Sequence, residues 1–203
     1  MINIKNFFNR LIFRDKSDGS ETFSRVKTPT VLQMEAVECG AASLTMILGY
    51  HNLHIPLSQM RVECGVSRDG SKASNIVIAA RKFGLDAKGF KKEPEELKYL
   101  KPPMIIHWNF NHFLVFEGYS NGKYYLNNPA SGHQVVGEEE FNNSFTGIVL
   151  TFEPTNEFKP GGKTNSIFDS IKDRLNGTKV ALTFLGLVGI TIIVPGLVIP
   201  TLT

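Results

Sequence analysis

Helical and strand-like patterns are separated along this chain, and the separation is the feature that most constrains its fold. Three helical segments come first, with apolar side chains at helical intervals, over residues 39–50, 57–64 and 72–83. A brief helical turn begins at Pro94. After Pro103 the pattern changes to short strands over 104–108, 112–119, 123–128, 134–136 and 147–153. Helices followed by antiparallel strands with short connections predict an α+β domain.

Capping and turn residues mark the ends of these segments. Ser71 is a candidate N-cap for the third helix, and Gly65 and Gly84 stand where a glycine commonly follows a helix end. Asn121–Gly122, between the second and third strands, is a strong signal for a two-residue hairpin turn.

The composition allows a substantial core and excludes several classes of function. With 203 residues, 42% of them apolar, the chain is long enough for one domain and a further segment. The net charge of +3 comes from scattered basic residues, so no nucleic-acid partner is expected. Two cysteines make no disulfide framework and have no metal-ligand spacing around them, so no metal site is expected.

The C-terminal run from Val180 to Thr203 carries no charged residue. Its 24 residues exceed the roughly 20 that a helix needs to cross a bilayer, so a membrane-spanning helix is predicted. The preceding flank, residues 159–179, holds five basic and two acidic residues, which predicts that this side of the span faces the cytoplasm. The N-terminus lacks the pattern of a secretory signal peptide, so the folded domain is expected on the same side.

The expected organisation has five parts. These are a polar lead over 1–28, a folded domain over 29–155, a linker over 156–166, an amphipathic helix over 167–178 and the span over 179–203. The amphipathic helix places Ile167, Ile171 and Leu175 on one face with charges opposite, which is typical of a helix lying on a membrane surface.

The tetrapeptide Val-Glu-Cys-Gly occurs twice and contains both cysteines, Cys39 and Cys64. Cys39 stands at the predicted start of a helix, where free backbone N–H groups and the helix dipole favour a thiolate. Cys64 stands at a predicted helix end, where the dipole is reversed. Position therefore favours Cys39 as a nucleophile and Cys64 as a structural residue, although a small buried apolar side chain is the plainer interpretation of either.

A cysteine nucleophile needs a base and a group that orients the base. Among the histidines, three fit exposed loops (His51, His54 and His133), and two lie at a strand end and a strand start (His107 and His112). The strand that begins at His112 can face the Cys39 helix. Asn127 and Asn128 end the next strand, and either amide could hold the imidazole in one tautomer, as in Cys–His–Asn triads.

Three stretches together resemble a known family: QMEAVECGAASLTMILGY (33–50), HFLVFEG (112–118) and NPASG (128–132). They are similar to the cysteine peptidase domain, of cysteine peptidase family 39, at the N-terminus of ABC transporters that process and export bacteriocins and lantibiotics. Exporters of peptides with long leaders of the nitrile-hydratase or Nif11 type are the most similar branch. The resemblance covers nearly all of residues 29–155 and implies a papain-like fold.

The resemblance implies roles for four residues. Cys39 matches the nucleophile, His112 the general base, and Gln33 the side-chain donor of the oxyanion hole. The third member of the triad is Asn128, where the family usually has aspartate. An amide orients an imidazole but stabilises the imidazolium less than a carboxylate does, so an active but slower enzyme is expected.

The family also implies a reaction and partners. The expected substrates are precursor peptides whose helical leader ends in Gly-Gly, Gly-Ala or a similar pair, cut after the second residue, with the leader helix bound to an apolar surface patch. A membrane domain and an ATP-binding domain follow the peptidase in such exporters. The chain is therefore expected to be a truncated N-terminal portion of a protein in the bacterial cell membrane, with a homodimer formed through the transporter part. ATP is expected only in the missing domain, and no cofactor is expected in this chain.

One motif points elsewhere, and two other interpretations stay open. Gly161–Thr164 imitates the end of a phosphate-binding loop, but Glu157 stands where the full motif needs glycine, so nucleotide binding is not expected. The first alternative is a peptidase-like domain that docks the leader for export without cutting it, which the asparagine at 128 favours. The second is a membrane-tethered structural domain with no peptide ligand, which would leave the motifs unexplained.

Overall fold

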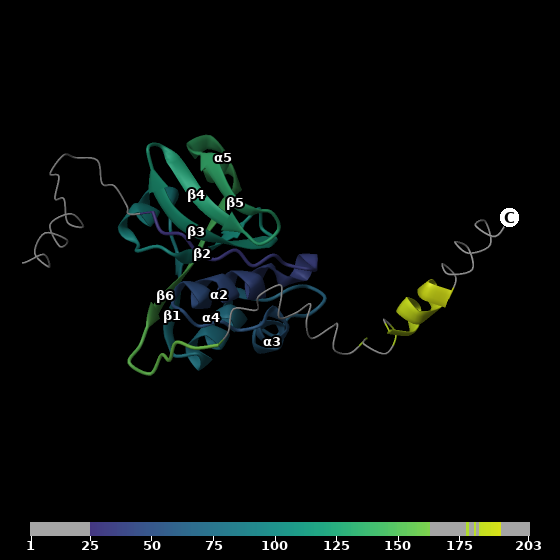
Figure 1. The fold of residues 1–203 in the computed structure, drawn as a ribbon. Helices are drawn as coiled ribbons and strands as arrows, with labels where there is room; N and C mark the ends of the chain where they lie inside the picture. The colour runs from purple at the N-terminus through teal and green to yellow at the C-terminus, as the bar shows by residue number, and fades with distance from the viewer. Residues whose placement is uncertain (1–24, 163–177, 179–180, 182, 192–203) are drawn as a thin grey trace, which may run out of the picture. The chain divides into compact units, whose positions relative to one another are not determined.

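The computed structural model describes residues 25–162, 178, 181 and 183–191 (Figure 1). The chain divides into two compact units, Met1–Gly162 and Lys163–Thr203. Residues 183–191 in the second unit are helical. No helix within the described ranges is both long and apolar enough to cross a bilayer. The predicted membrane-surface helix and most of the predicted span, 179–203, lie outside the described residues.

The first unit has the predicted order of elements, with helices before strands. They are η1 (Ala36–Glu38), α2 (Cys39–Tyr50), α3 (Leu57–Glu63), α4 (Ala73–Lys82), β1 (Leu85–Lys91), η2 (Pro94–Tyr99), β2 (Met104–Trp108), β3 (His112–Ser120), β4 (Lys123–Asn128), β5 (Gly132–Gly137), α5 (Glu138–Ser144) and β6 (Phe145–Pro154). The α+β prediction is confirmed, and three elements were not expected: the short η1, β1 and α5. The last two are polar segments: β1 buries Leu85 and Ala87 alone, and α5 buries only Phe141.

The strands form one sheet with the order β1-β6-β2-β3-β4-β5, and each neighbouring pair is antiparallel. The hairpin turn predicted at Asn121–Gly122 is confirmed, with φ of 52° and 73° at the two residues. Two positive φ values are the backbone conformation that joins twisted strands through a two-residue turn. The same left-handed conformation at Gly65 and Gly84, with φ of 55° and 81°, ends α3 and α4 as predicted.

The middle of the sheet carries a hydrophobic core on each face. Successive residues of β3 alternate between the two: Phe113 and Val115 pack with the core of α2, α3 and α4, whereas Leu114 and Phe116 pack with β4 and α5. Figure 1 shows the two parts, with α2, α3 and α4 gathered at one end of the unit and α5, β4 and β5 at the other. His112, the first residue of β3, therefore lies where the two parts meet.

Helix α2 is the centre of the helical part, because every residue from Cys39 to Leu48 is buried. Gly40 allows α4 to approach it closely: a Cβ at this position would lie 2.7 Å from Ile76 Cδ1. The predicted N-cap of α4 is wrong. Lys72 occupies the cap position, and the buried Oγ of Ser71 makes no hydrogen bond to any described residue.

The segment before η1 crosses the sheet and is fixed to it. Thr28, which the sequence analysis assigned to the polar lead, donates from its backbone N and its Oγ1 to the buried Oε1 of Glu117, over 2.6 and 2.8 Å. At the other end of the segment, the Gln33 backbone N–H donates to Pro129 O over 2.9 Å. The path of these residues thus carries Gln33 to the start of the β4–β5 turn.

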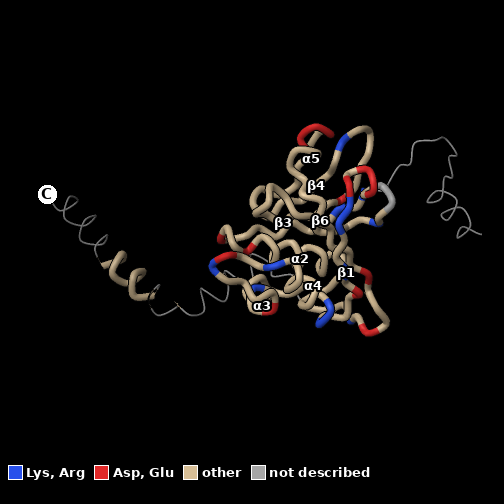
Figure 2. Tube along the Cα trace, turned by 180° about the vertical axis from the view of Figure 1, so that it is seen from behind, with Lys and Arg blue, Asp and Glu red and all other residues tan. Residues whose placement is uncertain are grey.

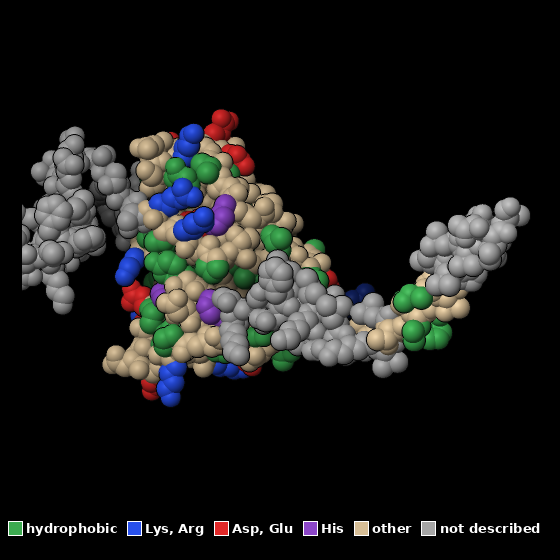
Figure 3. All heavy atoms as spheres, viewed as in Figure 1, with side chains coloured by type: hydrophobic (Ala, Val, Ile, Leu, Met, Phe, Trp, Pro, Cys, Tyr) green, Lys and Arg blue, Asp and Glu red, His purple; other side chains and the backbone are tan. Residues whose placement is uncertain are grey.

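Basic and acidic side chains of the described residues are mixed along the first unit. Figure 2 shows basic and acidic residues interspersed along the first unit, with an acidic cluster on α5. On the face shown in Figure 3, apolar, basic, acidic and histidine side chains are likewise mixed.

Candidate active site

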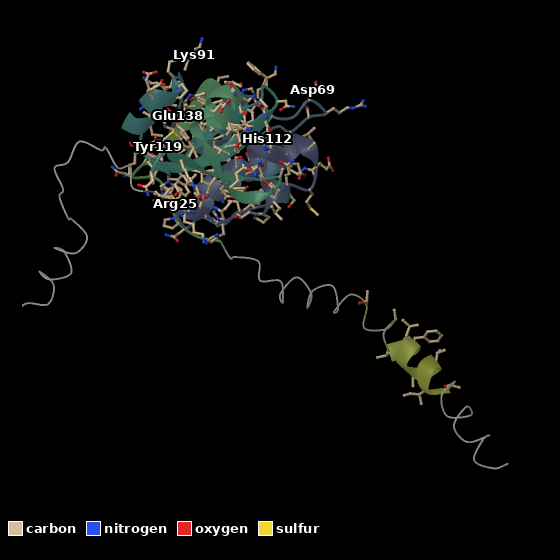
Figure 4. The ribbon with its side chains drawn as sticks, turned by 90° about the horizontal axis from the view of Figure 1, so that it is seen from above. Arg25, Asp69, Lys91, His112, Tyr119 and Glu138 are labelled. Carbon is tan, nitrogen blue, oxygen red and sulfur yellow. The ribbon has the colours of Figure 1, made fainter. Side chains whose placement is uncertain are left out.

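Cys39 is the first residue of α2 and lines a cleft of about 330 Å³. The cleft lies between the end of η1, the loop over 68–71 and the turn that joins β2 to β3. Its walls are formed by Ala36, Val37, Cys39, Arg68, Asp69, Gly70, Ser71, His107, Phe110, Asn111 and Phe113. Cys39 is 5% exposed, and the cleft gives a reactant access to it. In Figure 4, Asp69 and His112 lie on the same side of the domain, away from Tyr119 at the far end of β3.

Burial raises the pKa of the Cys39 thiol, while the backbone amides of Phe113, Gly40 and Cys39 itself act to lower it. The predicted effect of the helix start is therefore present, but the predicted net lowering of the pKa is wrong because desolvation outweighs it. A thiol of this kind becomes a nucleophile by giving its proton to a neighbouring base.

His112 and Asn128 form the hydrogen bond that such a base requires. His112 Nε2 lies 2.8 Å from Asn128 Oδ1. The Ala130 backbone N–H donates to the same Asn128 atom over 2.9 Å, which identifies that atom as the amide oxygen because it must be an acceptor. Nε2 therefore carries the ring proton, and Nδ1 of the neutral imidazole is left as an acceptor.

Only one of the two candidate amides reaches the histidine, because neighbouring residues of a strand point to opposite faces. Asn127 is fully buried and donates to the O and Oγ1 of Thr28, over 3.2 and 3.0 Å. The sequence left Asn127 and Asn128 equivalent on this point. The register of β4 assigns Asn127 to the N-terminal segment and Asn128 to His112.

The two chain neighbours of His112 line the same cleft as Cys39. They are Asn111 and Phe113. Ser43 on α2 donates to Phe113 O over 3.2 Å and so ties the helix to this end of β3. His107 also lines the cleft, but its Nδ1 lies 2.8 Å from Thr146 Oγ1. Burial and the neighbouring His112 lower the pKa of His107, which favours its neutral form.

Gln33 is held by its backbone beside the Asn128 turn, through the bond to Pro129 O. Its buried Oε1 has no hydrogen-bond partner among the described residues, so this amide is not engaged through its oxygen in holding the fold. Gln33 is not part of the cleft wall around Cys39. The role of donor to an oxyanion stays a prediction for this residue.

Two of the histidines predicted in exposed loops lie in different surroundings: His133 is exposed on β5, and His51 is half-buried. His133 Nδ1 lies 3.1 Å from the buried Glu117 Oε2. His51 is half-buried, and burial followed by the charge of Lys101 lowers its pKa. Neither ring lines the cleft at Cys39.

Sequence reasoning missed several residues around the cleft. Ser71 lines it with an unpartnered hydroxyl, and Phe110 lies at its mouth, 83% exposed, with a φ of 59°. Neither residue carried a recognisable signal. Glu38 did, as an acidic residue directly before the nucleophile, but its burial against Arg61 was not anticipated.

The fold and this arrangement are those of a papain-like cysteine peptidase: a cysteine at a helix start faces a cleft beside a strand whose first residue is a histidine held by an asparagine. The comparison with protein families gives the same result. Residues 27–157 match the peptidase C39 family, and the chain belongs to that family.

Solved structures extend the match. A double glycine motif protease from an AMS/PCAT transporter, solved in complex with the leader peptide, is 54% identical; the match covers 66% of this chain and 98% of that one, with a TM-score of 0.64. The peptidase domain of Streptococcus ComA is 23% identical over 62% of this chain and 97% of its own, with a TM-score of 0.59, which supports the fold alone.

Curated relatives are much longer proteins. The probable microcin-H47 secretion/processing ATP-binding protein MchF of Escherichia coli is 35% identical over 75% of this chain. The colicin V secretion/processing ATP-binding protein CvaB, also of Escherichia coli, is 35% identical over 66% of this chain. The matches span only 22% and 19% of the lengths of these two relatives.

Proposed function

We propose that this domain is a cysteine endopeptidase that removes the leader from ribosomally made precursor peptides of the bacteriocin or lantibiotic type. Cleavage follows the second residue of a double-glycine-type pair and is coupled to export by an ABC transporter. The observation that carries the proposal is the His112–Asn128 hydrogen bond, oriented by the Ala130 amide, with both chain neighbours of His112 lining the same cleft as Cys39.

Acylation would use three groups in turn. His112 Nδ1 accepts the proton of the Cys39 thiol, and Sγ attacks the carbonyl carbon before the scissile bond. The oxyanion that forms accepts hydrogen bonds from the Gln33 side-chain amide and the Cys39 backbone N–H. The C–N bond then breaks, the imidazolium gives its proton to the leaving amine, and a thioester between the leader and Cys39 remains.

Deacylation would use the same groups in reverse order. His112 takes a proton from water as its oxygen attacks the thioester carbonyl. The C–S bond breaks, the leader leaves with a carboxylate, and the proton returns to the Cys39 sulfur. Asn128 holds the imidazole in the tautomer that both halves require.

The cleft favours a substrate with glycine at the cleavage site. Its walls approach Cys39 from the 68–71 loop on one side and the β2–β3 turn on the other, within a volume of about 330 Å³. Glycine residues allow the substrate backbone to come close to the nucleophile without side chains that would need room.

An apolar groove adjoining this cleft is the site we assign to the leader helix. It has a volume of about 510 Å³ and is lined by Ala73, Ser74, Val77, Ile78, Arg81, Gly89, Phe90, Lys91, Ile148 and Leu150, from α4, β1 and β6. Ser71 lines the cleft and Ala73 lines the groove, so the two surfaces meet at the start of α4. An amphipathic helix bound along α4 would lead its C-terminal end toward Cys39.

The wider setting follows from the same proposal. The uncharged run over 180–203 serves as a membrane span, which keeps the peptidase at the cytoplasmic face of a bacterial membrane beside the transport path. A homodimer forms through the transporter part. ATP acts only in a separate ATP-binding domain, and the peptidase step itself uses no cofactor.

The test is cleavage of a synthetic leader peptide that ends in Gly-Gly and continues for several core residues. The whole 203-residue chain and its Cys39→Ala and Cys64→Ala variants are incubated with this peptide, and the products are identified by mass spectrometry. Cleavage after the second glycine, abolished only by Cys39→Ala, supports the proposal. Binding without cleavage would make the domain a docking module, and neither binding nor cleavage would leave a structural role.

The groove has a test of its own. Ile78 in the groove and Val135 on β5 are exposed to similar extents, 53% and 51%, so replacing each by glutamate is a matched pair. Ile78→Glu is expected to raise KM about tenfold with little change in kcat, because it removes binding that the substrate and the transition state share. Val135→Glu is expected to leave both constants unchanged, and equal effects of the two variants would exclude this groove.

A further inference from the structure

The side chain of Glu38, directly before the nucleophile, is buried and fully paired. It is 1% exposed. Its Oε2 accepts hydrogen bonds from the backbone N–H groups of Met34 and Glu35, over 2.7 and 3.1 Å. Its Oε1 lies 2.9 Å from Nη1 of Arg61 on α3. A buried carboxylate is costly unless charge and hydrogen bonds satisfy it, and here both oxygens are satisfied.

These bonds fix the segment that carries the predicted oxyanion donor. Met34 follows Gln33 in the chain, so the Glu38 carboxylate holds the backbone on the C-terminal side of Gln33. The Gln33 backbone N–H is itself held by Pro129 O, over 2.9 Å. The main chain at Gln33 is thus tied to two places: the turn after Asn128 and the residue before Cys39.

Arg61 connects this segment to a second element. Its guanidinium pairs with Glu38 and lies 3.7 Å from Glu35 Oε1. These ion pairs therefore link α3 to the turn over 34–38 through side chains. A displacement of the segment by about 1 Å would misalign the donor. A misplacement of that size can lower the rate of catalysis roughly a hundredfold.

We infer that Glu38, held by Arg61, is a positioning residue that sets the place of Gln33 relative to the reacting carbonyl. The inference rests on the proposed function, because Gln33 acts on an oxyanion only if the domain cleaves a peptide. It gives the acidic residue before the nucleophile a role in the reaction that is separate from the chemistry of the thiol.

The second Val-Glu-Cys-Gly copy supplies the matched control. Glu63 also precedes a cysteine and also pairs with a basic side chain, Lys82 Nζ, over 3.0 Å. Its side chain is 29% exposed, and that of Lys82 lies at the surface. Glu63→Gln therefore repeats the chemical change of Glu38→Gln at a site remote from Gln33.

The experiment compares Glu38→Gln with Glu63→Gln in the whole chain, using the leader peptide described above. Glu38→Gln is expected to lower kcat about ten- to a hundredfold and to change KM less than about threefold, because the donor acts on the transition state. Glu63→Gln is expected to leave both constants unchanged. Equal losses in the two variants, or a loss confined to KM, would overturn the inference.

A double-mutant cycle separates positioning from a general loss of structure. Gln33→Ala removes the donor, so adding Glu38→Gln to it should lower kcat by less than about threefold further if Glu38 acts through Gln33. Losses that multiply would show that Glu38 supports the fold only. Should Glu38→Gln not fold, Arg61→Lys takes its place in the cycle, since Arg61 is 41% exposed and lysine keeps the charge. A parent chain that cleaves no peptide would instead refute the proposed function.

Discussion

The two Val-Glu-Cys-Gly copies have the same four residues and nearly opposite surroundings. Cys39 begins α2 and lines a cleft, whereas Cys64 caps the end of α3 and is fully buried. Glu38 is buried against Arg61, and Glu63 pairs with Lys82 at the surface.

The two glycines differ in the same way. Gly40 is needed for close packing, since a Cβ there would lie 2.7 Å from Ile76, whereas Gly65 ends a helix with a φ of 55°. Four identical residues thus serve a helix start in one place and a helix end in the other. The difference between a reactive and a structural cysteine comes from the backbone around it.

The electrostatic surroundings follow this difference. Burial raises the pKa of both thiols, but three backbone amides oppose the rise at Cys39. At Cys64 the neighbouring Glu63 adds to the effect of burial, and the pKa reaches about 12. Two of these amides, those of Cys39 and Gly40, belong to the start of α2, as the helix dipole favours, and the third, that of Phe113, comes from β3.

The largest expected effect separates the two cysteines directly. Cys39→Ala should lower the rate of leader cleavage by about ten thousandfold or more, since loss of a nucleophile removes the covalent path. Cys64→Ala should change the rate less than about threefold and cost roughly 1–2 kcal/mol of unfolding free energy, because it leaves a small cavity. Peptide cleavage and thermal unfolding measure the two effects, and an inactive but folded Cys64→Ala would reverse the assignment.

The next effect concerns the residue six positions before each cysteine. Gln33 precedes Cys39 at this spacing, and the exposed Ser58 precedes Cys64. Gln33→Ala should lower kcat roughly a hundred- to a thousandfold through loss of an oxyanion donor. Ser58→Ala should leave kcat unchanged. A Gln33→Ala chain with unchanged kcat would remove the oxyanion role, and with it the basis for the positioning role of Glu38.

Thiol chemistry provides a smaller contrast that needs no substrate. With limiting iodoacetamide at pH 8, Cys39 should be alkylated at least about tenfold faster than Cys64, since amides and a cleft favour its thiolate. Peptide mapping by mass spectrometry gives the two rates. Faster alkylation of Cys64 would contradict the distinction between the two helix ends.

The same shift at Cys64 predicts a dependence of stability on pH. Its pKa is raised from 9.0 to about 12, so the folded state favours the neutral thiol. The stability that this contributes is fully present below pH 9 and is lost as the pH rises toward 12. Between pH 8 and pH 10, the unfolding free energy should therefore decrease more in the parent chain than in Cys64→Ala. Equal decreases would show that Cys64 does not titrate in this way.

Much of this fold could be predicted from the sequence because its signals are local. The hairpin at Asn121–Gly122 and the helix ends at Gly65 and Gly84 each depend on one backbone conformation that the residue type favours. Strand β1 was missed because it is an edge strand whose alternation of buried and exposed residues ends after Ala87.

The site was predictable to the same extent. Family motifs pointed to Cys39, His112 and Asn128, and the last two are hydrogen-bonded in the structure. The net direction of the Cys39 pKa was not predictable, because burial depends on side chains distant in the sequence. For the same reason nothing in the sequence joined Arg61 to Glu38, a contact that only the packing of α3 against η1 creates.

The smallest expected effect tests what the amide at position 128 does for the Cys39 site. Asn128→Asp should raise the rate of leader cleavage about two- to tenfold, because a carboxylate stabilises the His112 imidazolium that forms with the thiolate. It should also move the acidic limb of kcat/KM to higher pH, since the neutral imidazole accepts the thiol proton and a charged partner favours the protonated ring.

Two contacts decide whether this substitution fits. Ala130 N–H can still donate to a carboxylate oxygen, but the Asn128 Nδ2 that donates to Gln134 Oε1 over 3.5 Å is lost. Gln134 can restore a hydrogen bond by turning its own amide, because its nitrogen then faces the carboxylate. Asn142→Asp on α5 adds the same charge at an exposed site and should change neither rate nor pH profile. A slower Asn128→Asp chain with an unshifted acidic limb would show that Asn128 serves as an orienting amide that a charge cannot improve.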